Sequence, residues 1–180
     1  MALYTRTGDG GETECGDGRR VSKSDPRVAA LGEIDELNAQ VGLCLSACSA
    51  SEHGEVAEML RPVQGELCAV SAGLGPGGAA EANETGVARM EGQIDSICKK
   101  LGPLKQLVLP GGCEAACRLH VARAVCRRAE RAAVACAEGG GAVPAGVLRY
   151  LNRLSDLLFA LARLANRGAK GAEQTWPGAK

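Results

Sequence analysis

Apolar residues recur at intervals of three and four along most of the chain, which is the spacing of one face of an α-helix. The first such stripe begins at Leu31 and Ile34 and continues to about Cys48. It is preceded by Asp25-Pro26, and an Asp cap followed by Pro in the first turn is a common start of a helix. The pattern therefore predicts a long first helix between these limits.

Four further helices follow from the same periodicity, at about residues 52–73, 84–101, 114–138 and 145–166. Pro62 lies inside the first of these and is expected to bend it. The connection at 75–83 is rich in Gly and Ala with little to pack, so we expect it to be mobile. Ala and Leu recur while β-branched runs are scarce, which also favours helix over strand.

The remaining segments show no helical period. We expect residues 4–24 to form a loop, and residues 102–112 to run extended into a Pro-Gly-Gly turn. The tail reads as irregular, with Trp176 as its candidate anchor on the bundle. The sequence thus predicts an all-α protein of one domain at 1–180, divided into an N-terminal loop at 1–24, a five-helix bundle at 25–168 and a tail at 169–180.

Composition and charge exclude several classes of function. The 180 residues carry 21 basic and 21 acidic side chains, so no diffuse positive field favours a nucleic acid or an anionic membrane as partner. One Trp, two Tyr and one Phe are too few to stack the bases of a single strand. No apolar run approaches the ~20 residues of a membrane span. We expect a cytoplasmic protein, or one of the mitochondrial matrix if a presequence has been removed.

Nine Cys is a high and odd number, which does not suit the paired framework of a disulfide-rich domain. We interpret them as reduced thiols. Cys44 and Cys48 lie four apart, as do Cys113 and Cys117 with His120 three further on, and this spacing permits a metal site on one helix face. Small buried thiols are the commoner explanation, and we assign no metal ligands.

Candidate chemistry begins in the helix expected at 114–138. Arg123, Arg127 and Arg131 are spaced by four, so their guanidinium groups line one flank beside the apolar face. Like charges at this spacing disfavour an isolated helix, which suggests an anionic ligand. The alternative is a solvated face on which the arginines pair with Glu114, Glu130 and Glu138.

A glycine-rich loop supports the same chemistry. Residues 5–13, TRTGDGGET, contain three Gly whose backbone N–H groups can converge on a ligand, and three Thr that add hydroxyl donors. Such a loop suits a polyphosphate. It is not a Walker A loop, because the Gly-Lys-Thr/Ser ending and the following helix are absent. An ordinary Gly-rich turn would have the same composition.

The last helix carries polar residues beside its apolar stripe. Asn152, Asp156, Phe159 and Arg163 fall along one flank at spacings of four, three and four, which would turn polar groups inward. The alternative is a surface pair between Arg153 and Asp156, three residues apart.

The first helix contains an acid within its apolar face, where Asp35 follows Ile34. A half-buried carboxylate requires a cation. The candidates are the arginines of the helix at 114–138, in the same chain or in a neighbouring copy.

Five segments, taken in order, resemble a known protein family. They are YTRTGDGGET, VSKSDPRVAALGEIDELNAQVG, LVLPGG, AACRLHVARAVCRRAER and YLNRLSDLLFALAR, and they cover most of the chain. These motifs are similar to those of the PduO-type ATP:cob(I)alamin adenosyltransferases, or corrinoid adenosyltransferases. The resemblance implies a five-helix bundle that assembles as a homotrimer with active sites between subunits. It also implies transfer of the 5′-adenosyl group of ATP to the cobalt of a reduced corrinoid, giving adenosylcobalamin and triphosphate.

The resemblance carries roles to particular residues. The implied ATP-binding residues are Thr5, Arg6, Thr7, Gly8, Thr13, Glu14, Lys23, Arg127, Arg128, Glu130, Arg131 and Asn152. The implied catalytic residues are Asp35, Arg123, Arg127 and Asn152, with Asp35 paired to Arg123 across the subunit interface. Leu107 and Phe159 would face the corrinoid. The family often has Phe at the position of Leu107, and this departure bears on how far the lower axial ligand of cobalt is excluded.

Cofactors and partners follow from the same resemblance. ATP is the co-substrate, Mg²⁺ accompanies it, and cob(I)alamin or another reduced corrinoid accepts the adenosyl group. Expected partners are further copies of the chain, a flavin-type reductant protein and an adenosylcobalamin-dependent enzyme, with no nucleic acid and no membrane. Two alternatives remain: a non-catalytic carrier of ATP and adenosylcobalamin, and a helical interaction module with a surface Arg row.

Overall fold

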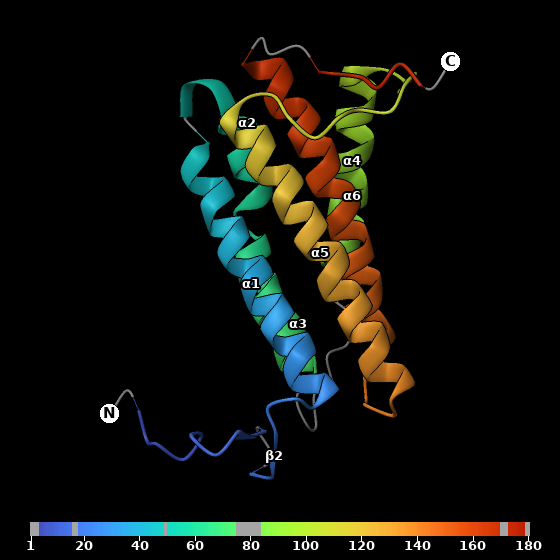
Figure 1. Ribbon diagram of the computed structural model, residues 1–180. Coiled ribbons are helices and arrows are strands. Elements are labelled where there is room, and N and C mark those ends of the chain that lie inside the picture. Colours follow the sequence, from blue (N-terminus) through green and yellow to red (C-terminus); the bar gives the residue numbers. More distant parts are fainter. Residues whose placement is uncertain (1–3, 16–17, 49, 75–83, 170–172, 179–180) are drawn as a thin grey trace.

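Helices make up most of the protein, as predicted. The structure is a computed structural model that describes residues 4–15, 18–48, 50–74, 84–169 and 173–178. The helices in these residues are α1 Pro26–Ala47, α2 Ala50–Leu60, α3 Val63–Gly73, α4 Glu84–Leu101, α5 Glu114–Glu138 and α6 Ala145–Gly168. They run side by side in one bundle (Figure 1). In it α5 packs against both α1 and α6, α4 packs against α6, and α3 packs against α1.

The helix predicted at 52–73 is divided into two. α2 ends at Leu60 and α3 begins at Val63, so the break falls at Arg61-Pro62. Proline has no backbone N–H to donate, and its ring clashes with the preceding turn of a helix. The predicted bend is therefore a full interruption. The connection at 75–83, which we expected to be mobile, lies outside the described residues.

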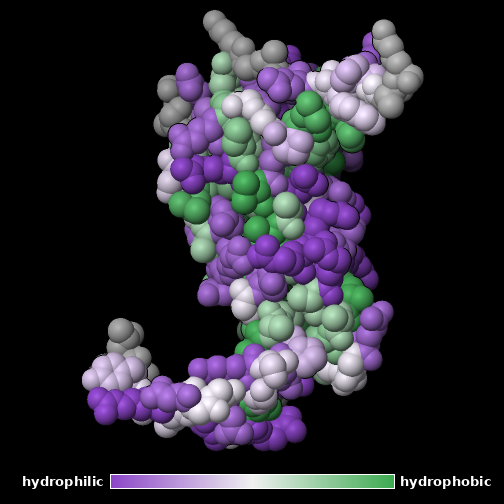
Figure 2. Space-filling model, viewed as in Figure 1, coloured by the Kyte–Doolittle hydropathy of each residue, from purple (hydrophilic) through white to green (hydrophobic). Residues whose placement is uncertain are grey.

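Two short strands occur in the N-terminal segment, which was expected to form only a loop. β1 Glu12–Glu14 and β2 Arg20–Ser22 pair in antiparallel register, with Thr13 opposite Val21. Three residues are too few to display the period of two that marks a strand, so the pattern did not reveal them. The pair lies below the start of α1, and the chain before it stands away from the bundle (Figures 1 and 2).

The ends of the helices follow from local chemistry. The Asp25 carboxylate accepts a hydrogen bond of 2.8 Å from the Arg27 N–H, and Pro26 is the first residue of α1. Gly102 follows α4 with φ of 76°, a conformation that favours glycine, and its N–H donates to the Cys98 carbonyl. These caps fix where the long helices begin and end.

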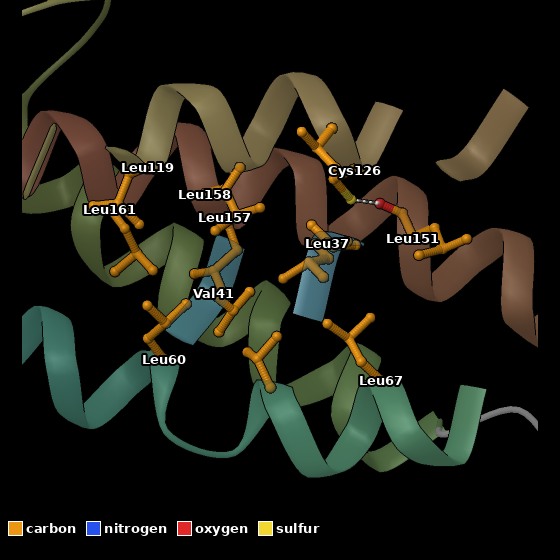
Figure 3. Close-up of a cluster of buried hydrophobic side chains, with 14 of the residues drawn as sticks. Leu37, Val41, Leu60, Leu67, Leu119, Cys126, Leu151, Leu157, Leu158 and Leu161 are labelled. Carbon is orange, nitrogen blue, oxygen red and sulfur yellow. Dashed lines mark hydrogen bonds between the residues drawn. The ribbon is translucent and has the colours of Figure 1, made fainter. Parts of the chain in front are cut away.

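The core is built from aliphatic side chains of all the helices, as the scarcity of aromatic residues requires. Figure 3 shows its centre, where α1 contributes Leu37 and Val41, and α5 and α6 face them with several leucines. Cys126 of α5 donates its thiol hydrogen to the Leu151 carbonyl of α6 over 3.2 Å. Polar residues predominate on the outer face seen in Figure 2. None of the helices among the described residues is long and apolar enough to cross a bilayer.

After α4 the chain crosses one end of the bundle, and we call residues 103–112 the end segment (Figure 1). It runs extended to a turn at Gly111-Gly112, as predicted. The tail, residues 173–178, pairs with it: the Leu109 N–H donates to the Gln174 carbonyl and the Trp176 N–H to the Leu107 carbonyl, both over 2.8 Å. Trp176 thus holds the tail through its backbone, while its side chain is 50% exposed.

Candidate active site

The N-terminal loop places its hydroxyl groups close together. The Thr5 and Thr7 hydroxyls are hydrogen-bonded over 2.8 Å, and the Arg20 guanidinium donates to the Thr7 carbonyl over 2.6 Å. Arg6 between them adopts φ of 62°, which is uncommon for a residue with a side chain. Its guanidinium lies 5.5 Å from the centre of the Tyr4 ring. The loop therefore has a defined shape that exposes hydroxyl and guanidinium donors.

Lys23 joins this loop from the turn that follows β2. Its backbone N–H donates to the Gly11 carbonyl over 2.8 Å. A Cβ atom placed on Gly8 would lie 3.3 Å from the Lys23 Nζ, so the ammonium group sits directly over this glycine. Thr13 and Glu14 lie beside them on β1. The structure thus brings together the N-terminal residues that the resemblance assigns to ATP.

The Arg row of α5 lies along one flank, as predicted. Arg127 and Arg131 are exposed and Arg123 is half-buried. The Arg131 guanidinium donates to the Arg127 carbonyl over 3.1 Å, and the Arg123 Nε is buried without a partner. No ion pair joins any of the three to a carboxylate within the described part of the chain. The face is solvated at Arg127 and Arg131, as in the alternative, but the described residues show no pairs with Glu114, Glu130 or Glu138, so the row remains available to an anion.

Glu130 has a different partner, because its Oε1 accepts a hydrogen bond of 3.0 Å from the Asn152 Nδ2. This bond connects the predicted site residues of α5 to those of α6. Asp156, one turn further along α6, is exposed and pairs with Arg153 over 2.9 Å. The expectation that polar groups of α6 face inward is therefore wrong for Asn152 and Asp156 in the single chain, and the surface pair is correct.

Arg128 lies on the other flank of α5 and points to α1. Its guanidinium pairs with Glu33 over 2.5 Å and also with Glu36. The hydrogen bonds that its guanidinium donates to Glu36 and to Glu33 raise the pKa of Arg128. Within one chain, the residue that the resemblance assigns to ATP thus links two helices.

Asp35 is exposed on α1, so the expectation of a half-buried carboxylate is wrong for the single chain. No ion pair joins it to Arg123 within the described residues. Three carboxylates thus lie on one turn of α1. Glu33 and Glu36 form ion pairs with Arg128, whereas Asp35 is exposed to solvent.

A buried histidine lies beside Phe159, one of the two residues expected to face the corrinoid. His120 of α5 is 4% exposed, and its ring centre is 6.1 Å from that of Phe159 on α6. Both ring nitrogens lack a partner. Burial, then the charge of Arg123, lowers the pKa of His120 against the opposing effect of Glu173, so the ring is neutral at pH 7. Leu107, on the end segment, is 62% exposed.

The predicted residues form two separate groups in one chain. The N-terminal segment with β2 lies beyond one end of the bundle (Figure 1), whereas the Arg row belongs to α5 and Asn152 to α6. A pocket of about 370 Å³ between α2, α4 and α6, which His53, Lys100 and Arg167 help to line, contains none of the predicted residues. Within one chain, the described residues show no contact between the two groups of predicted residues.

The cysteines do not form a metal centre in the described residues, where no group of three or more His, Cys, Asp or Glu side chains is arranged to hold an ion. All nine are free thiols. Burial raises the pKa of the Cys44 thiol to about 12, with the neighbouring Cys48 adding to the effect. Cys44, Cys126 and Cys136 are buried in the packing of the helices, whereas Cys68, Cys98 and Cys117 are exposed.

Sequence reasoning missed two polar residues near the end segment. Asn166 is 1% exposed on α6 and bonds to the turn before α5, and Glu173 of the tail pairs with Arg163 over 2.8 Å. A signal for Asn166 existed, because it is an amide within the apolar run at the end of α6. No comparable signal marked Glu173, since pairing of a tail with a distant helix leaves no periodic pattern.

Comparison with known proteins identifies the family. A family profile described as "Cobalamin adenosyltransferase" matches residues 3–165. The chain belongs to the cobalamin adenosyltransferase family. It is 42% identical over 176 residues to the corrinoid adenosyltransferase PduO of Salmonella typhimurium, covering 96% of this chain and 52% of that protein. It is 40% identical over 176 residues to a cobalamin adenosyltransferase of Cupriavidus metallidurans, covering 97% and 93% of the two chains.

The cobalamin adenosyltransferase fold is also evident in solved structures. A variant of a PduO-type ATP:corrinoid adenosyltransferase from Lactobacillus reuteri, complexed with cobalamin and ATP, superposes with a TM-score of 0.91 at 34% identity. The match covers 99% of this chain and 98% of that one. The chain spans about half the length of the PduO relatives that it matches, and nearly all of the relative from Cupriavidus.

Proposed function

We propose that the protein transfers the 5′-adenosyl group of ATP to the cobalt of cob(I)alamin or a related reduced corrinoid, releasing triphosphate. The observation that carries this proposal is the Arg row of α5. Arg123, Arg127 and Arg131 lie on one flank without a carboxylate partner among the described residues, in a chain of the cobalamin adenosyltransferase family. An unneutralised row of this kind suits the phosphates of ATP.

ATP binding would use both groups of residues. The loop at Thr5 to Gly8, with Thr13, Glu14 and Lys23, supplies hydroxyl and ammonium donors. Helix α5 supplies the guanidinium groups of Arg127, Arg128 and Arg131. Helix α6 supplies the amide of Asn152, which is held by its hydrogen bond to Glu130. Because the two groups lie apart in one chain, we infer that the loop of one subunit meets the helices of another in a homotrimer. Arg128 would then hold α1 and α5 in register beside the phosphates.

The chemistry explains why such groups suffice. Cobalt in cob(I)alamin is a strong nucleophile, so no general base is needed. Its electron pair forms the cobalt–carbon bond at the ribose 5′-carbon, while the bond from that carbon to the triphosphate oxygen breaks. The leaving triphosphate takes the electron pair. Lys23, Arg127 and a Mg²⁺ ion carried by the nucleotide would stabilise its charge, and holding both substrates in line makes the reaction intramolecular in effect.

Asp35 and Arg123 would act through position. Asp35 is exposed on α1 and the Arg123 Nε is buried without a partner, so each lacks its counter-charge within the described part of one chain. Pairing between subunits would satisfy both. This pair would keep the nucleotide and corrinoid sides of the site in register.

The corrinoid would lie against Leu107 and Phe159. Phe159 is half-buried beside the uncharged ring of His120, and Leu107 and Phe159 would give this wall of the site its apolar surface. An apolar wall disfavours the polar lower ligand of cobalt and so favours its displacement. Leu107 offers less surface than Phe at the same position. We therefore expect the lower ligand to be displaced less completely than in relatives with Phe.

The proposed setting of the reaction is the cytoplasm or the mitochondrial matrix. A flavin-type reductant protein would supply cob(I)alamin, and an adenosylcobalamin-dependent enzyme would receive the product. We propose that residues 1–180 form one helical-bundle domain, with the N-terminal loop at 1–24, the bundle at 25–168 and the tail at 169–180.

The experiment that tests the proposal follows the visible absorbance of chemically reduced cob(I)alamin with Mg-ATP under anaerobic conditions. Wild type is compared with Arg127→Ala and with the control Arg118→Ala, which removes a guanidinium of the same helix that pairs with Glu114. We expect adenosylcobalamin with wild type and with the control, and little with Arg127→Ala. If wild type binds ATP but forms no product, the protein is a carrier and the proposal is wrong.

A further inference from the structure

Asn166 holds the turn that joins the end segment to α5. Its Oδ1 accepts a hydrogen bond of 2.9 Å from the Cys113 N–H, and its Nδ2 donates one of 3.0 Å to the Gly111 carbonyl. The side-chain amide of Asn166 is therefore hydrogen-bonded to the backbone on both sides of Gly112. Cys113 is the cap residue of α5, so the same contact also sets where that helix begins.

The fit around Gly112 shows how closely the amide approaches the turn. A Cβ atom on Gly112 would lie 1.9 Å from the Asn166 Oδ1, which no side chain tolerates. Gly112 also has φ of 112°, a backbone conformation that favours glycine. Asn166 is 1% exposed at the end of an apolar stretch of α6. A buried amide with both of its polar atoms bonded specifies one arrangement of the backbone that it contacts.

A second contact from the same turn of α6 holds the other part of the end segment. Arg163 pairs with Glu173 over 2.8 Å, and their side chains are 11% and 25% exposed. Glu173 begins the tail, whose backbone bonds to Leu107 and Leu109. The end segment is thus attached to one turn of α6 twice, directly through Asn166 and indirectly through the tail.

From these contacts we infer that Asn166 is a positioning residue for the corrinoid. It fixes the end segment, and with it Leu107, relative to Phe159 on the same helix α6. It makes no contact with a reacting atom. The inference rests on the proposed function, and it adds a residue that determines how the apolar wall is aligned against the lower face of the corrinoid.

The test uses Asn166→Asp in the full chain. The new carboxylate still accepts from the Cys113 N–H, but its second oxygen faces the Gly111 carbonyl, and two acceptors repel. We expect the KM for the corrinoid to rise roughly tenfold, the size expected for one buried hydrogen bond replaced by an unpaired acceptor. The dissociation constant for ATP should stay within about twofold, because the nucleotide groups are remote from this turn. The fraction of four-coordinate cob(II)alamin, measured by electron paramagnetic resonance with Mg-ATP, should fall.

Two further variants separate positioning from general stability. Arg167→Ala removes a neighbouring contact from α6 to the Lys100 carbonyl and should change neither the corrinoid KM nor the cobalt spectrum. Glu173→Gln removes the ion pair to Arg163 that attaches the tail to α6, while it leaves the contacts of Asn166 in place. It should shift both quantities in the same direction as Asn166→Asp even if the latter folds poorly. A wild-type spectrum and corrinoid KM in both the Asn166 and Glu173 variants would overturn the inference. Failure of wild type to form adenosylcobalamin would instead refute the proposed function.

Discussion

Asn152 of α6 donates a hydrogen bond of 3.0 Å to the Glu130 carboxylate of α5. Asn152 is exposed, and Glu130 is half-buried beside the Arg row of α5. Glu130 bonds to Asn152 and forms no ion pair with Arg127 or Arg131 within the described residues. Both arginines are therefore open to an anion.

Replacement of Asn152 tests this relationship. Asn152→Ala should lower turnover at least about tenfold, because Glu130 is then able to neutralise the Arg row. One exposed hydrogen bond contributes little to folding, so Tm should fall by no more than about 4 °C. Arg153→Ala is the matched control, since it breaks surface pairs one residue further along α6. Equal loss of turnover in the two variants would contradict the assignment.

The proposed pair of Asp35 and Arg123 is testable by exchanging the charges. Asp35→Arg and Arg123→Asp should each weaken the trimer and lower turnover, because each leaves like charges facing across the interface. The double variant should recover a large part of both. Sedimentation and turnover are measured on the same samples. If the losses of turnover and of trimer in the two single variants simply add in the double variant, Asp35 and Arg123 do not meet across the interface.

The buried network of Tyr150 should contribute to stability and not to catalysis. The Tyr150 hydroxyl donates to Glu66 over 2.7 Å, and Glu66 also pairs with Arg89 over 2.7 Å. Tyr150→Phe should lower the free energy of unfolding by about 1 kcal/mol, measured by urea titration, since Glu66 keeps its second partner. The corrinoid KM and turnover should not change. A selective loss of activity would place this network in the site.

Stability should fall at alkaline pH because of buried acids. The Cys44 thiol has a pKa of about 12 when folded, against 9.0 as the reference value for an exposed thiol. Between these values the unfolded chain binds fewer protons, so the free energy of unfolding decreases with pH, by at most about 1.4 kcal/mol per pH unit for this group. Well below pH 9 the thiol is protonated in both the folded and the unfolded chain, so it adds no pH dependence to the free energy of unfolding there. Urea titrations of wild type and Cys44→Ala at pH 8 and pH 10.5 measure the effect.

The Cys44→Ala variant should lose less stability between these two pH values than wild type. Burial also raises the pKa values of Cys126 and Tyr150, so the fall should be reduced and not abolished. An identical fall in the two proteins would mean that Cys44 does not titrate on unfolding.

Much of the fold was predictable because helix boundaries depend on local chemistry. Helix α1 begins where Asp25 caps it and Pro26 occupies its first position. Helix α4 ends at Gly102, which adopts a positive φ. The position of the irregularity at Pro62 was also predicted correctly, but a bend was expected and the helix is interrupted there. Strands as short as β1 and β2 depend on each other and carry no signal of their own.

The candidate site was predictable only as far as single helices determine it. The spacing of Arg123, Arg127 and Arg131 gives one flank of α5 whatever surrounds it. Which flank of α6 is covered depends on neighbours, so Asp156 was expected inside and lies outside. The contacts of Arg128 with α1 and of Asn166 with the end segment join residues far apart in sequence, and periodicity contains no information on such pairs.

Product stoichiometry tests the central claim most directly. Wild type is supplied with cob(I)alamin and ATP labelled with ¹³C at the ribose 5′-carbon, and the products are followed by ¹³C and ³¹P nuclear magnetic resonance. Adenosyl transfer predicts one intact triphosphate for each labelled carbon bonded to cobalt, and loss of both products together in Arg127→Ala. Release of ADP and phosphate, or triphosphate without a cobalt–carbon bond, would contradict it.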